Sequence, residues 1–90
     1  MSMNSPTVHL GDNVVAQVLD GQMVLLDTSG GHYFELNASG TVMLEQLLAG
    51  ASHAEVAAAV ERKFLVTSER VKADLDALLL TLREAGLIKG

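Results

Sequence analysis

The pattern of apolar and polar positions along this chain is strand-like before Asn37 and helical after it. Before it, aliphatic and β-branched residues fall in two short runs, Val14–Leu19 and Gln22–Asp27, which are separated by Asp20-Gly21. An Asp-Gly pair between two apolar runs is a strong hairpin signal, because a type I′ turn needs positive φ at both central positions. The pattern therefore predicts two antiparallel strands.

A second turn and a third strand follow the hairpin. Gly30-Gly31 can take positive φ, and residues 32 to 36 alternate in a strand-like way. The alternation places Phe34 and Leu36 on the core face. Tyr33 falls on the other face, either as a partly buried cap or as an exposed aromatic side chain able to contact a ligand.

This third strand directly precedes the helical part of the chain, so we expect it at a sheet edge with backbone N–H and C=O groups unpaired. Such an edge can accept an extended peptide as an additional strand. It could also pair with a second copy of the chain, and we therefore expect a monomer or a weak homodimer.

Helical periodicity takes over after Asn37, a typical N-cap residue. Ser52 and Glu55 form a capping box, and Thr67 or Ser68 caps a further helix. The three predicted helices cover residues 38–49, residues 53–64 and the segment from the Thr67 or Ser68 cap to Gly86.

The third predicted helix carries more apolar surface than one core contact needs. Leu79 lies to one side of its main stripe and Leu80 lies opposite it. Either Leu80 is an isolated exposed leucine, or the helix lines a groove beside the third strand. The main stripe consists of Val71, Leu75, Leu78 and Leu82. The residues expected to flank the groove are Arg70, Lys72 and Asp74.

These elements predict an α+β domain in the order βββααα, with three helices covering one face of a three-stranded antiparallel sheet. Its outline is that of a winged helix-turn-helix. Residues 1–12 show no period and are expected to form a flexible N-terminal segment. Residues 13–90 form the domain, and Leu87 and Ile88 are expected to fold back onto its core.

Composition narrows the function classes. Eleven carboxylates against six Lys and Arg give a net charge of −5, which disfavours nucleic acid as a partner, because phosphate contacts need basic residues. The absence of cysteine excludes disulfides and thiolate chemistry. No apolar run approaches the roughly 20 residues of a membrane span, and residues 1–10 lack a signal-peptide pattern. We expect a cytoplasmic protein with no membrane partner.

No constellation of catalytic residues emerges. His9, His32 and His53 have no partner at metal-ligand spacing. Asp74 and Asp76 diverge on a helix, and general acid–base chemistry needs convergent groups. We therefore expect no catalytic residues, no metal and no cofactor.

Several segments together resemble the PqqD-like family. They are the Val-Leu-Leu-Asp run ending at Asp27, the Tyr-Phe-Glu-Leu-Asn-Ala-Ser-Gly run ending at Gly40, Ala57 with Val60, Val71-x-x-Asp74, Leu78-Leu79, Leu82, and Gly86-Leu87-Ile88. The resemblance spans about residues 14 to 88. More narrowly, it is a likeness to the stand-alone recognition elements of lasso-peptide biosynthesis, which serve ribosomally synthesised, post-translationally modified peptides (RiPPs).

The resemblance implies a non-catalytic protein that binds the leader segment of a precursor peptide as a strand beside the third strand and the third helix. Lasso leaders generally carry a Tyr and a Pro, so an apolar pocket with a polar rim is expected. The implied partners are that leader, a leader-cleaving cysteine protease subunit and then a cyclase. The implied peptide-binding residues are Gly31, His32, Tyr33, Phe34, Glu35, Leu36, Arg70, Val71, Asp74, Leu75 and Leu78.

Two alternatives stay open at this point. One is a PqqD-type peptide chaperone in pyrroloquinoline quinone biosynthesis. The other is a small winged-helix DNA-binding regulator, which would have to read DNA with only Arg70, Lys72 and Arg83 on its third helix.

Overall fold

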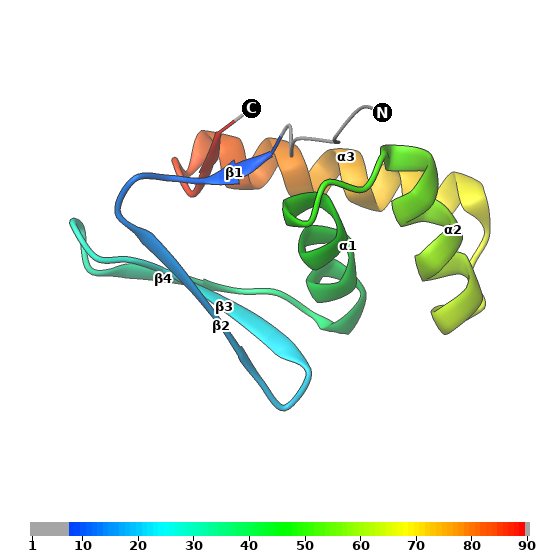
Figure 1. The fold of residues 1–90 in the computed structure, drawn as a ribbon, viewed down its shortest axis with the longest axis horizontal. Helices are drawn as coiled ribbons and strands as arrows, with labels where there is room; N and C mark the ends of the chain where they lie inside the picture. Colours follow the sequence, from blue (N-terminus) through cyan, green and yellow to red (C-terminus); the bar gives the residue numbers. More distant parts are fainter. Residues whose placement is uncertain (1–7, 90) are drawn as a thin grey trace, which may run out of the picture.

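The computed structural model describes residues 8 to 89. A three-stranded antiparallel sheet, in the order β2-β3-β4, is followed by three helices, and a separate two-stranded ladder joins β1 to β5 (Figure 1). The predicted α+β arrangement of three strands and three helices is confirmed. The elements are β1 (His9–Leu10), β2 (Val14–Leu19), β3 (Gln22–Asp27), β4 (His32–Glu35), α1 (Ala38–Leu48), α2 (His53–Phe64), α3 (Ser68–Glu84) and β5 (Ile88–Lys89).

The β2–β3 hairpin turns at the Asp-Gly pair. Asp20 and Gly21 have φ angles of 52° and 76°, both positive as a type I′ turn requires. The register pairs Val15 with Leu26, and Leu26 with Tyr33. These three side chains therefore form one row across the face of the sheet that we call the outer face.

The turn from β3 to β4 is organised by one carboxylate. Oδ1 of Asp27 accepts hydrogen bonds from the Ser29 N–H at 3.0 Å, the Ser29 hydroxyl at 2.7 Å and the Gly30 N–H at 3.3 Å. Gly31 then takes a φ of 72°, and its N–H donates to the Asp27 carbonyl at 2.9 Å. The start of β4 is thereby fixed relative to the end of β3.

The helices begin where their capping residues predict. The side chain of Asn37 caps α1, that of Thr67 caps α3, and both hydrogen bonds of the Ser52–Glu55 capping box are present at the start of α2. The first helix ends at Leu48, one residue before its predicted end, because the next residue already serves as its C-cap.

Residues 8–12 depart from the prediction of a flexible N-terminal segment. His9–Leu10 pairs antiparallel with Ile88–Lys89, and the side chain of Val8 is only 2% exposed. A two-residue strand is too short to show alternation, so no periodic signal marks it. The fold therefore begins before the predicted boundary at residue 13, while residues 1–7 of the predicted segment lie outside the described residues.

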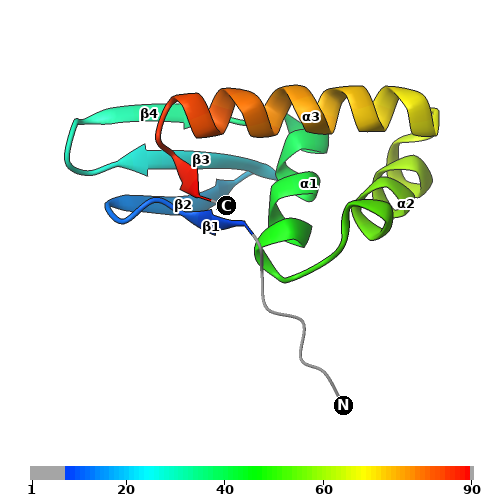
Figure 2. The same cartoon turned by 90° about the horizontal axis from the view of Figure 1, so that it is seen from above.

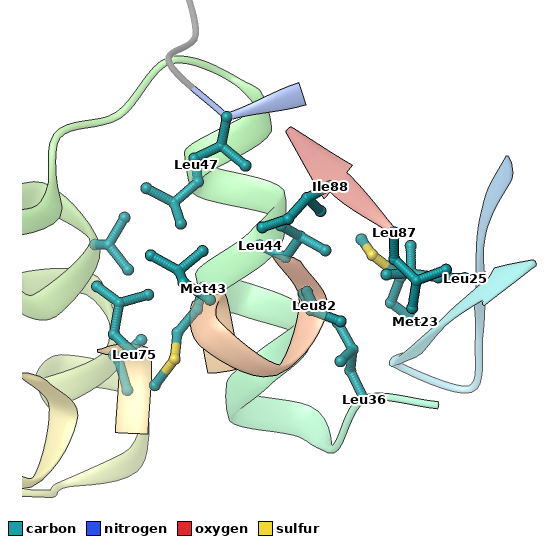
Figure 3. Packing of buried hydrophobic residues seen from close by; sticks show 14 of the residues in the cluster. Met23, Leu25, Leu36, Met43, Leu44, Leu47, Leu75, Leu82, Leu87 and Ile88 are labelled. Carbon is teal, nitrogen blue, oxygen red and sulfur yellow. The ribbon is translucent and has the colours of Figure 1, made fainter. Parts of the chain in front are cut away.

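The hydrophobic core lies between α1, α3 and the face of the sheet opposite the outer face, which we call the inner face (Figure 3). Leu87 and Ile88 fold back onto this core as predicted, each 4% exposed. Its buried hydrophobic members are Val8, Met23, Leu25, Leu36, Met43, Leu44, Leu47, Val56, Ala57, Val60, Val71, Leu75, Leu79, Leu82, Leu87 and Ile88.

The prediction that all three helices cover the sheet is wrong for α2. This helix packs against α1 and α3, on the side of α1 away from the strands (Figures 1 and 2). The reason is the 11-residue α1, which stands at the end of the sheet, and the short link after it, which holds α2 beside it. The long α3 alone runs along the sheet (Figure 2).

The buried stripe of α3 also differs from the prediction at one position. Leu79 is buried at 2% exposure, whereas Leu78 is only half-buried. Both leucines fit a helical stripe with Leu75 and Leu82, so periodicity cannot choose between them. In the structure, Leu78 faces the start of α1, where a Cβ built on Gly40 would lie 3.7 Å from its Cδ2 atom.

Candidate functional site: the open edge of β4 and the groove beside α3

β4 is an edge strand, with β3 on one side and no strand of residues 8–89 on the other. The Leu36 N–H donates to the Met23 carbonyl at 2.8 Å, so the backbone polar groups of Leu36 face β3. Because these groups alternate in direction along a strand, those of Tyr33 and Glu35 face away from β3. The predicted edge is therefore confirmed, and it offers an N–H and a C=O group at each of these two positions.

A groove lies beside this edge, with a volume of about 310 Å³. We call it the β4–α3 groove. Its walls come from the end of β4, the first half of α1 and one face of α3, and an ion pair between Arg70 Nε and Asp74 Oδ2, 3.2 Å apart, lies along it. Its lining residues are Phe34, Asn37, Ser39, Gly40, Met43, Arg70, Asp74, Ala77, Leu78 and Thr81.

The junction of β4 and α1 shapes one wall of this groove. Asn37 ends the strand and accepts the Gly40 N–H at 2.8 Å through its side-chain Oδ1 atom. A Cβ on Gly40 would lie 3.0 Å from that oxygen, tighter than ordinary contact. A larger residue at this position would push into the cap and toward Leu78, so glycine lets the start of α1 approach α3 closely.

The structure divides the predicted site residues of α3 into two groups. Arg70, Asp74 and Leu78 line the β4–α3 groove. Val71 and Leu75 are 0% and 2% exposed and belong to the core, so they support the groove from beneath instead of facing it.

Lys72, which the sequence placed at the flank of this groove, lies elsewhere. It lines a separate hollow with His53 and Asp76, on the side of α3 that faces α2.

Sequence reasoning also missed six lining residues of the β4–α3 groove. Two of them, Ala77 and Thr81, continue the helical face of Arg70 and Asp74 and could have been found by that spacing. The other four, which depend on tertiary contact, are Asn37, Ser39, Gly40 and Met43.

The side chains of β4 alternate as predicted. Leu36 is 3% exposed and Phe34 is half-buried on the inner face. Tyr33 is 66% exposed on the outer face, so of its two interpretations the exposed aromatic is confirmed. Glu35 and His32 are also exposed, and Gly31 lies in the turn that precedes the strand.

A second hollow lies at the other end of β4, with a volume of about 290 Å³. We call it the Asp27 hollow. Hydrogen bonds from the Ser29 hydroxyl and N–H lower the pKa of the Asp27 carboxyl below its ordinary value of 3.8, so this group is ionised at neutral pH. Phe34 lines both hollows and separates them. The lining residues are Asp27, His32, Tyr33, Phe34, Ala85 and Leu87.

The described surface shows no constellation suited to metal chemistry. His9, His32 and His53 are all exposed, and within residues 8–89 no group of three or more His, Cys, Asp or Glu side chains is placed to hold a metal ion. Nor does any helix in this range have the length and apolar content to cross a membrane. What the site does present is an open strand edge beside two side-chain hollows, the geometry in which a sheet binds an extended peptide.

Two solved structures resemble this chain along nearly its whole length. One is described as lasso peptide synthetase B1 complexed with the leader peptide; it is 30% identical, with a TM-score of 0.85, and the match covers 93% of this chain and 99% of that one. The other is TbiB1 in complex with the TbiA(beta) leader peptide, also 30% identical, with a TM-score of 0.81 and coverage of 91% and 95%. No curated protein sequence shows significant similarity.

The sequence model of one protein family, coenzyme PQQ synthesis protein D (PqqD), matches residues 22–88. That range includes β3, β4, all three helices and the start of β5, and so contains nearly the whole site described above. The resemblance drawn from the sequence is confirmed: the chain belongs to the PqqD family.

Proposed function

We propose that this chain is a non-catalytic recognition protein that binds the leader segment of a ribosomal precursor peptide as an added strand along β4. The observation that carries this proposal is the open edge at Tyr33 and Glu35, with the β4–α3 groove beside it. Main-chain hydrogen bonds to such an edge give affinity, and side-chain pockets next to it give sequence selectivity.

The similar structures support this assignment, because both hold a leader peptide on a chain of the same fold. Because one of them is a lasso peptide synthetase B1, we assign this chain to lasso-peptide biosynthesis. The protein presents its bound leader to a cysteine protease subunit and then to a cyclase, in the cytoplasm. It works as a monomer or weak homodimer and uses neither a cofactor nor a metal.

The proposed peptide-contacting set keeps most of the residues implied by the sequence. Glu35 and Tyr33 supply edge hydrogen bonds, whereas Val71 and Leu75 act from the core by holding α3 in place. Phe34, Arg70, Asp74 and Leu78 form the selective surface of the groove. Gly31 lies just before the edge strand and Leu36 just after it. His32 is the first residue of the strand, and its side chain lies on the inner face.

Substitution of the edge by proline tests strand addition. Glu35→Pro removes an N–H that faces away from β3, so the sheet of the free protein keeps its own hydrogen bonds. Leaving a buried carbonyl of the bound peptide unpaired costs about 1–3 kcal/mol, and we expect leader binding to weaken by about 5- to 150-fold. The measurement is calorimetric titration with a synthetic leader peptide of a lasso precursor.

Ala16→Pro is the matched control, because it lies on β2, the opposite edge. The Thr28 N–H donates to the Asn13 carbonyl at 2.7 Å, so alternation along β2 directs the Ala16 N–H away from β3 as well. Equal losses for Glu35→Pro and Ala16→Pro, or unchanged affinity for Glu35→Pro, would rule out leader addition at β4.

A second candidate function is a PqqD-type peptide chaperone in pyrroloquinoline quinone biosynthesis, which the matched family model favours by its description. It uses the same edge with a different peptide. Parallel titrations with a lasso precursor and with a pyrroloquinoline quinone precursor distinguish the two, and we expect the tighter complex with the lasso leader.

A further inference from the structure

We propose that the Asp27 hollow is a second side-chain subsite of the β4 edge, and that it selects a lysine or arginine of the bound peptide. This inference rests on the proposed function, since it assumes that a peptide lies along β4. It adds a charge preference that neither the fold nor the edge hydrogen bonds require.

The position of the hollow is the first argument. Asp27 and His32 are directly paired across β3 and β4, and both side chains lie on the inner face, as Phe34 does. The hollow is closed at its far side by Ala85 and Leu87, at the end of α3. A strand added to β4 would pass the β4–α3 groove and the Asp27 hollow in turn, with Phe34 between them.

The second argument is charge complementarity. The three hydrogen bonds that the Asp27 side chain accepts within the turn all end on its Oδ1 atom, and within residues 8–89 none ends on Oδ2. No lysine or arginine lines the hollow, and its one basic group, the imidazole of His32, makes only the smallest contribution to the lowered pKa of the Asp27 carboxyl. An ionised carboxylate with an available oxygen therefore lies in a hollow whose other walls include Phe34, Ala85 and Leu87.

Those walls determine which cation fits. Lysine and arginine carry an aliphatic stem that packs on apolar surface and a charged end that seeks a carboxylate. A peptide residue with only one of these properties would leave either the apolar wall or the Asp27 carboxylate without a partner. The hollow therefore suits a long basic side chain better than a short polar or a purely aliphatic one.

Strand geometry adds a spacing rule. Side chains of an added strand alternate between the two faces of the sheet, and both hollows open on the inner face. The basic residue and the residue that enters the β4–α3 groove must therefore be an even number of positions apart in the peptide.

Selection from a random 15-residue peptide display library on the immobilised full chain tests this subsite. We expect enriched peptides to carry Lys or Arg at one position, at an even spacing from a conserved apolar position, and this preference to vanish with Asp27→Asn. Asparagine keeps the Oδ1 acceptor of the turn and removes only the charge. Asp20→Asn, in the other turn of the sheet, loses the same charge away from the hollow and should keep the preference.

A synthetic copy of one enriched peptide gives the magnitude. Replacing its basic residue by norleucine should weaken binding to the unmodified chain about three- to fivefold, as for a partly exposed ion pair, and should not affect binding to Asp27→Asn. Replacing that residue by glutamate should weaken binding further, a comparison that needs no protein variant.

Each outcome separates the two proposals. Enriched peptides without a basic position, or with the same preference on Asp27→Asn, would overturn the subsite and leave the proposed function in place. If no peptide is enriched, or if the enriched peptides bind Glu35→Pro as tightly as the unmodified chain, strand addition itself fails and the subsite fails with it.

Discussion

At the scale of single residues, Thr41 joins the sheet to the helices. It is the one buried polar side chain of the described core, at 2% exposure. Its Oγ1 accepts the Met23 N–H at 2.7 Å and donates to the Asn37 carbonyl at 2.9 Å. One hydroxyl thus satisfies a backbone donor of β3 and holds the first turn of α1 against it.

Thr41→Val tests this connection. Valine has the same shape but leaves the buried Met23 N–H without an acceptor, and we expect a loss of about 1–3 kcal/mol in the free energy of unfolding. Urea denaturation measures the loss. Thr28→Val is the matched control, because the Thr28 hydroxyl also donates to a carbonyl, that of Asn13, but at the surface. Similar costs for both variants would contradict the role assigned to Thr41.

The lowered pKa of Asp27 predicts how the stability of the fold depends on pH. Its pKa in the folded protein lies below 3.8, chiefly because the Ser29 hydroxyl donates to its carboxylate. A lowered folded pKa means that the carboxylate stabilises the fold at pH values above 3.8, and that this contribution is lost as the pH falls through the folded pKa. Carbon-detected NMR titration should show Asp27 ionising below 3.8.

The stability of Asp27→Asn should accordingly fall less steeply on acidification than that of the unmodified protein. Asp20→Asn serves as the reference for loss of a turn carboxylate in the same sheet. An Asp27 titration at or above its ordinary value would contradict the hydrogen-bonded turn.

At the scale of elements, α3 has two different faces. Leu79 is 2% exposed in the core, while its neighbour Leu80 is 58% exposed. We expect Leu79→Ala to cost about 2–5 kcal/mol of unfolding free energy, because it leaves a cavity in a packed core. Leu80→Ala, the matched control on the same helix, should change it by less than about 0.5 kcal/mol. Chemical denaturation measures both, and a larger loss for Leu80→Ala would mean that α3 is rotated.

Elements with strong local signals could be predicted from the sequence. The hairpin follows from Asp20-Gly21, and the helix starts follow from Asn37 and the Ser52 capping box, because each signal lies within a few residues of the structure that it specifies. The open edge of β4 could be predicted as well, from the order of strands before helices.

Features that depend on tertiary contact could not be predicted. The β1–β5 ladder pairs His9 with Lys89, two positions at opposite ends of the chain. The orientation of α3, which buries Leu79 and leaves Leu78 at the groove beside Gly40, depends on how α1 and α3 pack together. The same packing brings Ser39, Gly40 and Met43 of α1 into the groove, and no spacing in the sequence predicts this.

At the scale of the whole molecule, charge separates a peptide-binding protein from a DNA-binding one. The net charge is −5. Arg70 is paired with Asp74, Lys89 with Asp12, and Lys72 lines a hollow that also contains Asp76. Arg62 and Lys63 are the one adjacent pair of basic residues, so within residues 8–89 the winged-helix outline is not accompanied by the broad basic face that phosphate contacts require.

We accordingly expect no binding to random-sequence duplex DNA, even at about 50 mM salt, where non-specific affinity is high. Fluorescence anisotropy with a labelled duplex measures this. The same protein preparation should bind its leader peptide, which shows that it is folded. Binding that weakens steeply as salt is added would restore the regulator as an alternative.

The β1–β5 ladder has a consequence for how this domain can be joined to other polypeptides. His9 and Lys89 are directly paired, and seen from above, the β1–β5 ladder lies toward β2 and away from β4 (Figure 2). Domains whose ends meet at one surface point tolerate insertion into a host chain. The open edge of β4 and the β1–β5 ladder are thus separate, so a connection to another polypeptide made at the ladder would leave β4 open to solvent.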